Sequence, residues 1–109
     1  MTGVLQIVTT TSSREEAERI ARELVAQRLA ACVQVGGPIS STYRWQGQLE
    51  TAQEWTCAIK TLDSHYQQVE ATIRELHSYE VPEILAFRVA EVSAAYLSWL
   101  SSEINPSVR

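Results

Sequence analysis

The hydrophobic positions of this chain follow two periods, one typical of strands and one typical of helices. Residues 4–10 form a short apolar run rich in β-branched side chains, which predicts a central strand covered on both faces. Between Ala17 and Leu29 the apolar residues recur at the helical period, and charged residues take the other positions. The pattern therefore predicts a strand followed by a helix whose apolar stripe lies on the sheet.

Two capping boxes mark where the predicted helices begin. In the first, the Ser13 hydroxyl and the Glu16 carboxylate are spaced to satisfy free backbone N–H groups of a first turn, and a helix of about 17 residues follows. The second, from Ser64 to Gln67, opens another amphipathic helix. Pro82 limits how far that second helix can extend.

Residues 31–62 predict a long β-hairpin. Its first arm, 31–45, contains a Gly-Gly-Pro run at 36–38, which indicates a bulge or bend rather than the end of the strand. A Gln-Gly pair at 46–47 suits a tight turn, and the alternation of apolar and polar residues along 48–62 predicts the return arm.

The remaining residues predict a fourth strand over 84–92 and a short helix from about Ala94, capped by Ser93. The order of elements is then β-α-β-β-α-β with a final helix, which is the order of the ferredoxin-like split βαβ sandwich. We therefore predict an α+β fold in which two helices cover one face of an antiparallel sheet. With 109 residues and no internal repeat or linker, residues 1–109 are expected to form a single domain.

Composition and charge exclude several classes of protein. The formal net charge is −4 and the basic residues are scattered, so nucleic-acid binding is not expected. No apolar run approaches the roughly 20 residues that span a bilayer, and the amino end lacks the basic and apolar segments of a leader peptide. We expect a cytoplasmic protein with no membrane partner.

No pattern in the sequence predicts catalysis. The chain has no Gly-x-Ser-x-Gly motif, and the junction at residues 9–13 carries neither the glycines nor the lysine of a phosphate-binding loop. Cys32 and Cys57 lie inside apolar runs, where a thiol is usually a small buried hydrophobe, although a disulfide or a metal ligand stays open. We therefore expect a protein that is not an enzyme.

The hairpin is predicted to extend beyond the helices that cover the sheet. Each arm, at about 15 residues, can reach roughly 50 Å, whereas the first helix spans roughly 25 Å. The distal part carries Tyr43, Trp45, Leu49 and Trp55, which a single chain would leave exposed beside unpaired strand edges. We predict a homo-oligomer in which the hairpin pairs with a neighbouring subunit.

Several blocks of residues carry a resemblance to a known family. In chain order they are Ala30-Ala31-Cys32-Val33, residues 41–47 (STYRWQG), Glu54 with Lys60-Thr61, residues 77–84 (HSYEVPEI), and Tyr96-Leu97 with Trp99. Together they resemble the CutA family, called divalent cation tolerance proteins, across nearly the whole chain. The resemblance implies a ferredoxin-like protomer similar to PII signal transducers, assembled as a trimer through the long hairpins.

The resemblance also implies a link to copper and other divalent cations. Some members take ligands from a Cys on the first strand and from one His or a His pair before the Tyr-x-x-Pro-Glu block. In this chain Thr9 stands at the Cys position, Leu76 precedes His77, and Ser78 replaces the usual Pro. Since affinity for copper rests on several N and S donors that converge, the resemblance implies weak binding or a changed metal preference.

Three residues are the candidate metal ligands: His77, Glu80 and Glu83, which offer one nitrogen and two oxygens. At the end of a helix His77 can instead be a cap that the helix dipole favours, and the glutamates can form a solvated turn or pair with an arginine. The resemblance includes Glu83, which makes it the better candidate of the two glutamates. No cofactor is required, and copper or another divalent cation is the expected ligand.

Four further residues are assigned to a ligand pocket or a subunit interface: Tyr43, Trp45, Lys60 and Tyr79. Tyr43 and Trp45 suit interface anchors or the walls of a pocket between subunits. Lys60, the only lysine, can bind an anionic ligand or pair with a glutamate. His65, in the first turn of the second helix, is expected to be a neutral surface residue.

These observations favour a trimeric, non-enzymatic divalent cation tolerance protein that binds copper or similar ions weakly. One alternative is a PII-like sensor that holds a small anionic metabolite between subunits through Lys60, Tyr43 and Glu83. Another is a trimeric scaffold whose function lies in a protein partner, with no small ligand.

Overall fold

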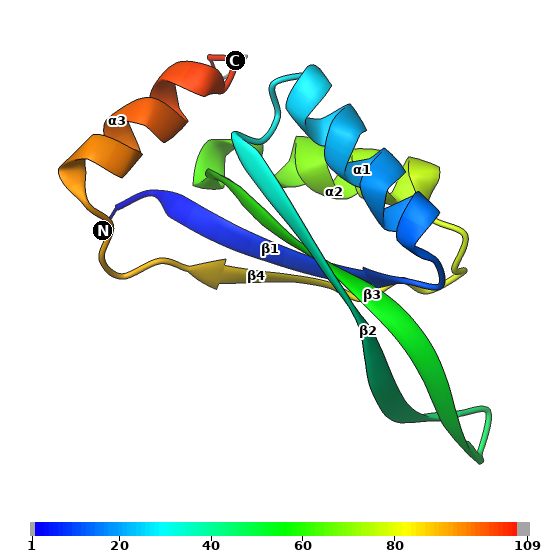
Figure 1. Cartoon of the computed structure of the whole chain (residues 1–109). Helices are drawn as coiled ribbons and strands as arrows, with labels where there is room; N and C mark the ends of the chain where they lie inside the picture. The colour runs from blue at the N-terminus through cyan, green and yellow to red at the C-terminus, as the bar shows by residue number, and fades with distance from the viewer. Residues whose placement is uncertain (1, 107–109) are drawn as a thin grey trace.

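The computed structural model describes residues 2–106 and folds them into one antiparallel sheet with helices (Figure 1). The strands lie in the order β2-β3-β1-β4, and every neighbouring pair is antiparallel. This is the predicted ferredoxin-like arrangement, followed by a helix. The elements in chain order are β1 (Val4–Thr11), α1 (Arg14–Ala26), β2 (Cys32–Trp45), β3 (Gln48–Leu62), the 3-10 turn η1 (Asp63–His65), α2 (Tyr66–Leu76), β4 (Ile84–Arg88) and α3 (Ala94–Glu103).

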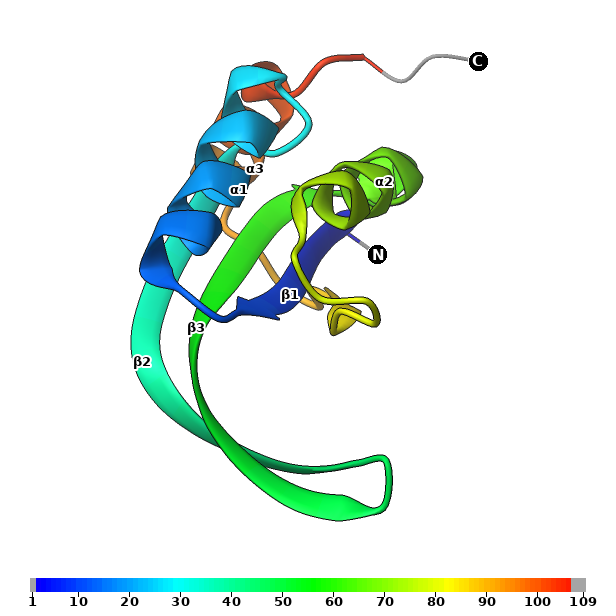
Figure 2. The same ribbon diagram turned by 90° about the vertical axis from the view of Figure 1, so that its right-hand side faces the viewer.

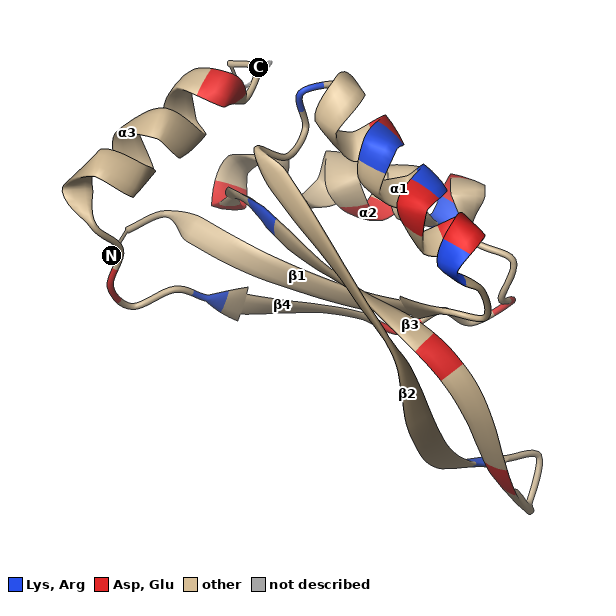
Figure 3. Ribbon diagram, viewed as in Figure 1, with Lys and Arg blue, Asp and Glu red and all other residues tan. Residues whose placement is uncertain are grey.

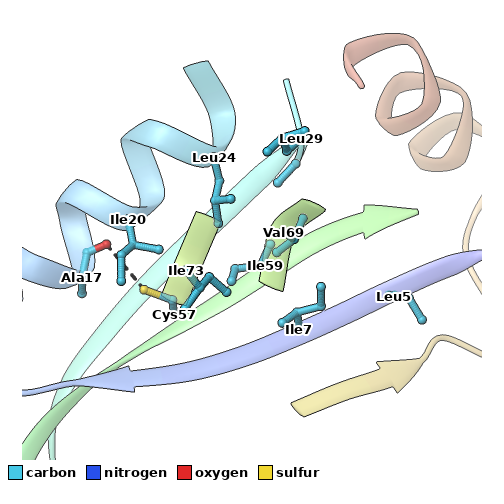
Figure 4. Close-up of a cluster of buried hydrophobic side chains, with 11 residues drawn as sticks. Leu5, Ile7, Ala17, Ile20, Leu24, Leu29, Cys57, Ile59, Val69 and Ile73 are labelled. Atoms are coloured by element: carbon cyan, nitrogen blue, oxygen red, sulfur yellow. Dashed lines mark hydrogen bonds between the residues drawn. The ribbon is translucent and has the colours of Figure 1, made fainter. Parts of the chain in front are cut away.

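The main core lies between one face of the sheet and the helices α1 and α2 (Figure 4). Its fully buried side chains come from both layers, and Ile7, Ile20, Ile59 and Ile73 are among them. A second apolar cluster under α3 is centred on Leu100. The opposite face of the sheet is less covered, because Leu85 and Phe87, which point away from the main core, are about half exposed.

The first helix is shorter than predicted. It ends at Ala26 after 13 residues, because Arg28 adopts a left-handed conformation with φ 60° and turns the chain out of the helix. Leu29 is still buried, so the apolar stripe continues in the turn rather than in the helix. The Arg28 side chain donates to the carbonyls of Ser102 and Glu103, both at 3.0 Å, and ties this turn to α3.

Of the two predicted capping boxes, the first is half right and the second is wrong. Ser13 accepts a hydrogen bond from the backbone N–H of Glu16, but the Glu16 carboxylate reaches a different part of the chain, described below. The second helix begins at Tyr66 with no side-chain cap, after a 3-10 turn. His65 is 2% exposed, so the prediction of a surface residue is also wrong.

The fourth strand is shorter than the predicted 84–92, since β4 ends at Arg88 and one further backbone bond joins Val89 to Val4. The final helix begins as predicted at Ala94, where Ser93 caps it by accepting from the Tyr96 N–H. Neither difference changes the order of the elements.

The predicted excess length of the hairpin is confirmed. Pairing between β1 and β3 stops at Thr11 and Trp55, so residues 48–54 of β3 pair with β2 alone. The predicted bulge lies between Gly36 and Ile39, and the turn uses positive φ angles of 50° and 81° at residues 46 and 47. Figure 2 shows residues 39–54, the distal hairpin, curving back beneath the segment that links α2 to β4.

Candidate functional site

A cavity of about 300 Å³ opens between the distal hairpin and the segment that links α2 to β4. Five of the seven residues that the sequence marked as site candidates line it, namely Tyr43, Trp45, Tyr79, Glu80 and Glu83. The other lining residues are Thr10, Glu54 and Val81. We call this cavity the acidic pocket. It joins residues from the hairpin, from the end of β1 and from the connection before β4.

Strand alternation places the hairpin side of the pocket. Ile39 lies opposite Glu54 and Tyr43 lies opposite Glu50, so the odd residues of this arm of β2 share a face with the even residues of β3. Tyr43, Trp45 and Glu54 therefore project from the same face of the hairpin. Tyr43 and Trp45 are 43% and 46% exposed, whereas Glu54 is 7% exposed. The carboxylate lies deepest of the three.

The carboxylate of Glu54 contacts Tyr79 across the pocket. The Tyr79 hydroxyl donates to Glu54 Oε2 at 2.7 Å. Burial, followed by this hydrogen bond and the charge of Glu54, raises the pKa of Tyr79. Within residues 2–106 no Lys, Arg or His lies within ion-pair distance of Glu54. Glu54 is thus a buried carboxylate whose charge has no cationic partner in this part of the chain.

Glu54 is one of the residues that carry the family resemblance, but no role was predicted for it from the sequence. The signal that could have found it is the strand alternation itself, because it puts Glu54 on the same face as the two aromatic candidates. A buried carboxylate in the distal hairpin, whose other residues are more exposed, is an informative exception.

His77 lies behind the pocket wall rather than in it. Its side chain is fully buried, and its ring lies 4.8 Å from that of Tyr79 between centroids. Nε2 donates to the carbonyl of Thr10 at 2.7 Å, and Nδ1 accepts from the Tyr79 backbone N–H at 3.1 Å. These partners fix the neutral tautomer with its proton on Nε2. The contact of 3.4 Å from Nδ1 to Glu16 is then not an ion pair.

Glu16 holds the start of the loop that carries the lining residues. Its two carboxylate oxygens accept from the Ser78 backbone N–H and the Ser78 hydroxyl, each at 2.8 Å. Glu16 is 6% exposed, so these charge-assisted bonds are shielded from water. They link the beginning of α1 to the end of α2 and fix where Tyr79 enters the pocket.

Two of the three predicted metal ligands line the pocket, and the third, His77, does not. Glu80 and Glu83 are exposed and line the pocket, whereas both ring nitrogens of His77 are already hydrogen-bonded. Among residues 2–106, no group of three or more His, Cys, Asp or Glu side chains is placed to hold a metal ion. Thr9, at the position where some relatives have Cys, is fully buried, and its hydroxyl has no hydrogen-bond partner in the described chain.

Lys60 and the two cysteines lie away from the pocket. Lys60 donates to the Gln34 side chain at 2.7 Å and is paired with no glutamate within residues 2–106. Cys32 and Cys57 are both free thiols, so the disulfide left open above is absent from the described chain. Burial, with a smaller effect of the nearby Glu16 charge, raises the pKa of Cys57 to about 11.

The charge of the pocket decides what it can bind. Glu54, Glu80 and Glu83 bring three carboxylates to its lining, and no Lys, Arg or His is among the lining residues. Figure 3 shows two acidic positions along the distal part of β3 and a basic one beside the hairpin turn, and α1 carries both signs. Such a lining attracts cations and repels anions. It gives no support to an anionic metabolite bound through Lys60.

Comparisons with known proteins identify relatives of this chain. Residues 5–103 match the family model described as CutA1 divalent ion tolerance protein. The chain is 40% identical over 94 residues to the divalent-cation tolerance protein CutA of Thermus thermophilus, which covers 86% of this chain and 91% of that protein. The crystal structure of CutA from Xylella fastidiosa is 41% identical, with a TM-score of 0.92 and coverage of 94% and 99%.

A third relative is described with its cellular compartment. The protein from Archaeoglobus fulgidus, described as a periplasmic divalent cation tolerance protein, is 34% identical and has a TM-score of 0.91, with 94% of this chain and 99% of that one covered. Within residues 2–106 no helix combines the length and apolar character needed to cross a membrane.

Proposed function

This chain belongs to the CutA1 divalent ion tolerance family, and we propose that it acts as a trimer that binds divalent cations weakly in the acidic pocket. The observation that carries this proposal is the gathering of Glu54, Glu80 and Glu83 around one cavity without a basic lining residue. Carboxylate oxygens are common ligands of divalent metal ions.

The proposed ligands differ in how readily they can reach a metal ion. Glu80 and Glu83 are exposed and can turn toward an ion without breaking a contact. His77 can bind copper only after it gives up its bond to the Thr10 carbonyl or to the Tyr79 N–H. We therefore propose that the glutamates make the first contacts, and that His77 adds a nitrogen only at the cost of a buried hydrogen bond.

A trimer is proposed because two surfaces of this chain lack cover. The distal hairpin extends beyond the sheet with Leu49 71% exposed, and the face of the sheet opposite the core exposes Leu85 and Phe87. Apolar side chains next to unpaired strand edges are typical of subunit interfaces. Copies of the same chain are the partners we propose for both surfaces.

We propose a cytoplasmic, non-catalytic role. The two free cysteines suit a reducing compartment, in which disulfides rarely persist. The pocket combines carboxylates with aromatic rings, and its lining includes neither a cysteine nor a histidine that could serve as a nucleophile or base. Binding of a cation, rather than its chemical conversion, is the activity that this lining favours.

Calorimetric titration of the metal-stripped protein with Cu(II) and Zn(II) tests the proposal. We expect about one ion per chain with an affinity on the order of micromolar, weakened about tenfold in Glu83→Gln. Glu91→Gln is the matched control, since it removes the same charge from an exposed residue that does not line the pocket. Binding lost in His77→Ala would add the imidazole to the ligand set. An absence of binding by both metals would contradict the proposal.

A further inference from the structure

We infer that the acidic pocket also binds a small organic cation, of the class of aliphatic diamines, with one ammonium group at Glu54 and the other at the exposed glutamates. Amine binding goes beyond the proposed function, because it uses the same cavity but does not require a bound metal ion. Three features of the pocket carry the inference: its charge, its aromatic walls and the difference in burial between its carboxylates.

The carboxylate at the buried end of the pocket favours a cation. Glu54 is 7% exposed and has no Lys, Arg or His within ion-pair distance among the described residues. Its one hydrogen-bond donor in that part of the chain is the Tyr79 hydroxyl. A carboxylate removed from water is stabilised by an opposite charge and by further donors. An ammonium group supplies both, since it carries a full charge and three N–H donors.

The aromatic residues favour an alkylammonium over a hydrated metal ion. Tyr43, Trp45 and Tyr79 all line the cavity. Aromatic rings attract organic cations through their π faces, and they bury the methylene groups of an alkyl chain at the same time. A small metal ion bound through oxygen ligands uses neither property. The combination of three rings with three carboxylates therefore suits a ligand that is both charged and apolar.

The positions of the carboxylates favour two charges on the ligand rather than one. Glu54 is buried, whereas Glu80 and Glu83 are exposed, so negative charge lies at both the deep and the open parts of the lining. A chain of a few methylene groups with an ammonium at each end places a charge at both. The cavity of about 300 Å³ lies at the lower end of the range typical of small-molecule sites, which suits so small a ligand.

The test is calorimetric titration of the metal-stripped, full-length protein with 1,4-diaminobutane. The uncharged 1,4-butanediol, which has the same carbon chain, is the control ligand. We expect the diamine to bind and the diol not to bind. Glu54→Gln should weaken diamine binding at least tenfold, and it can keep the bond from Tyr79, because the amide oxygen still accepts.

Two tryptophan variants separate the pocket from the rest of the surface. Trp45→Leu removes an aromatic wall and should weaken diamine binding about fivefold. Trp99→Leu is its matched control, because Trp99 is 43% exposed against 46% for Trp45 but lies on α3, away from the lining residues. Both residues are partly exposed, so neither variant is expected to unfold, and thermal unfolding checks this.

The outcomes distinguish amine binding from metal binding. No diamine binding, equal binding of the diol, or an affinity unchanged in both Glu54→Gln and Trp45→Leu would each overturn the inference. Titration of Trp45→Leu with Zn(II) should give the wild-type affinity, because no aromatic ring is a proposed metal ligand. Metal binding without diamine binding would overturn the inference of amine binding but not the proposed function. Diamine binding without metal binding would support the inference and contradict the proposed function.

Discussion

The packed body of the sheet and the distal hairpin bury their side chains to very different extents. In the body, Ile7, Ile59 and Ile73 are fully buried between the sheet and the helices. Within residues 39–54, by contrast, Glu54 is the single buried residue, and Trp45 and Leu49 are 46% and 71% exposed. The body buries an apolar core and exposes Leu85 and Phe87 on its outer face, whereas the hairpin buries one charged group and leaves its apolar side chains exposed.

This difference indicates that different residues of the chain stabilise the fold and line the pocket. Burial of apolar side chains stabilises the body. The hairpin continues from it and presents side chains that the body does not cover. Three lining residues of the acidic pocket, Tyr43, Trp45 and Glu54, belong to the hairpin. No lining residue of the pocket belongs to the main core, so substitutions should separate stability from the proposed function.

The largest effect on stability is expected from the body. Ile59→Ala removes a fully buried side chain from the core and should lower the free energy of unfolding by about 2–5 kcal/mol. The measurement is denaturant unfolding at one fixed protein concentration, since assembly would add to the apparent stability. A loss below about 1 kcal/mol would mean that the core between the sheet and the helices α1 and α2 is not the main source of stability.

The next effect is a loss of stability at alkaline pH that depends on Cys57. The pKa of this thiol is raised from 9.0 to about 11 in the folded protein. The folded state therefore holds the proton more tightly, and the contribution is complete below about pH 9 and lost as the pH rises through about 11. Its size is on the order of 2–3 kcal/mol.

The pH dependence of Cys57→Ala tests this, because the variant lacks the titrating group. Between pH 9 and 11, its free energy of unfolding should fall less steeply than that of the wild type. The cavity that the substitution leaves lowers the free energy of unfolding equally at every pH, and the tyrosines titrate in both proteins. Neither effect therefore changes the difference between the two slopes. Identical slopes for the two proteins would show that the buried thiol is not responsible.

A smaller effect is expected where the hairpin leaves the body. Gly37 has a φ of 135°, and a Cβ there would lie 2.9 Å from Trp55 Cδ1 and 3.0 Å from the Glu54 carbonyl oxygen. Gly37→Ala should therefore cost about 1–3 kcal/mol. Its effect should extend to the pocket, because the crowded backbone carries Glu54.

Gly47→Ala is the matched control for that substitution. Gly47 also has a positive φ, of 81°, but a Cβ there meets nothing within 4 Å. This variant should lose only the cost of the left-handed conformation, about 1 kcal/mol. Equal losses in the two variants would contradict the close approach at Gly37.

The smallest effect is expected at the exposed end of the hairpin. Leu49→Ser replaces a side chain that is 71% exposed and should change the free energy of unfolding by less than about 0.5 kcal/mol under dilute conditions. The same substitution should weaken assembly, which sedimentation can measure. A large loss of stability in dilute solution would mean that Leu49 packs within its own chain.

Local patterns predicted most of the fold. The strand alternation, the Gln-Gly turn and the Gly-Gly-Pro bulge are each set by neighbouring residues, and all three are confirmed. The predicted end of α1 was wrong because the apolar pattern continues to Leu29, although the helix ends at Ala26. The second capping box was wrong because Ser64 lies in a 3-10 turn, where its hydroxyl contacts the ring of His65.

The candidate site depends on contacts that local patterns do not contain. Residues 43 and 79 are far apart in the sequence, and no local pattern predicts that both line one pocket. The hydrogen bonds of His77 to Thr10 and of Glu16 to Ser78 join different elements across the fold. Spacing along the chain predicts neither, so the sequence alone did not indicate that both ring nitrogens of His77 are hydrogen-bonded or that Glu54 lines the pocket.

The distal hairpin is proposed to be incomplete in a single chain, and the molar mass in solution is the decisive measurement. Sedimentation equilibrium at micromolar concentration should give about three times the 12.2 kDa of one chain, and Leu49→Ser should shift the distribution toward smaller species. A mass near 12.2 kDa for the wild-type protein would mean that the exposed hairpin is stable without a partner, and the proposed trimer would be wrong.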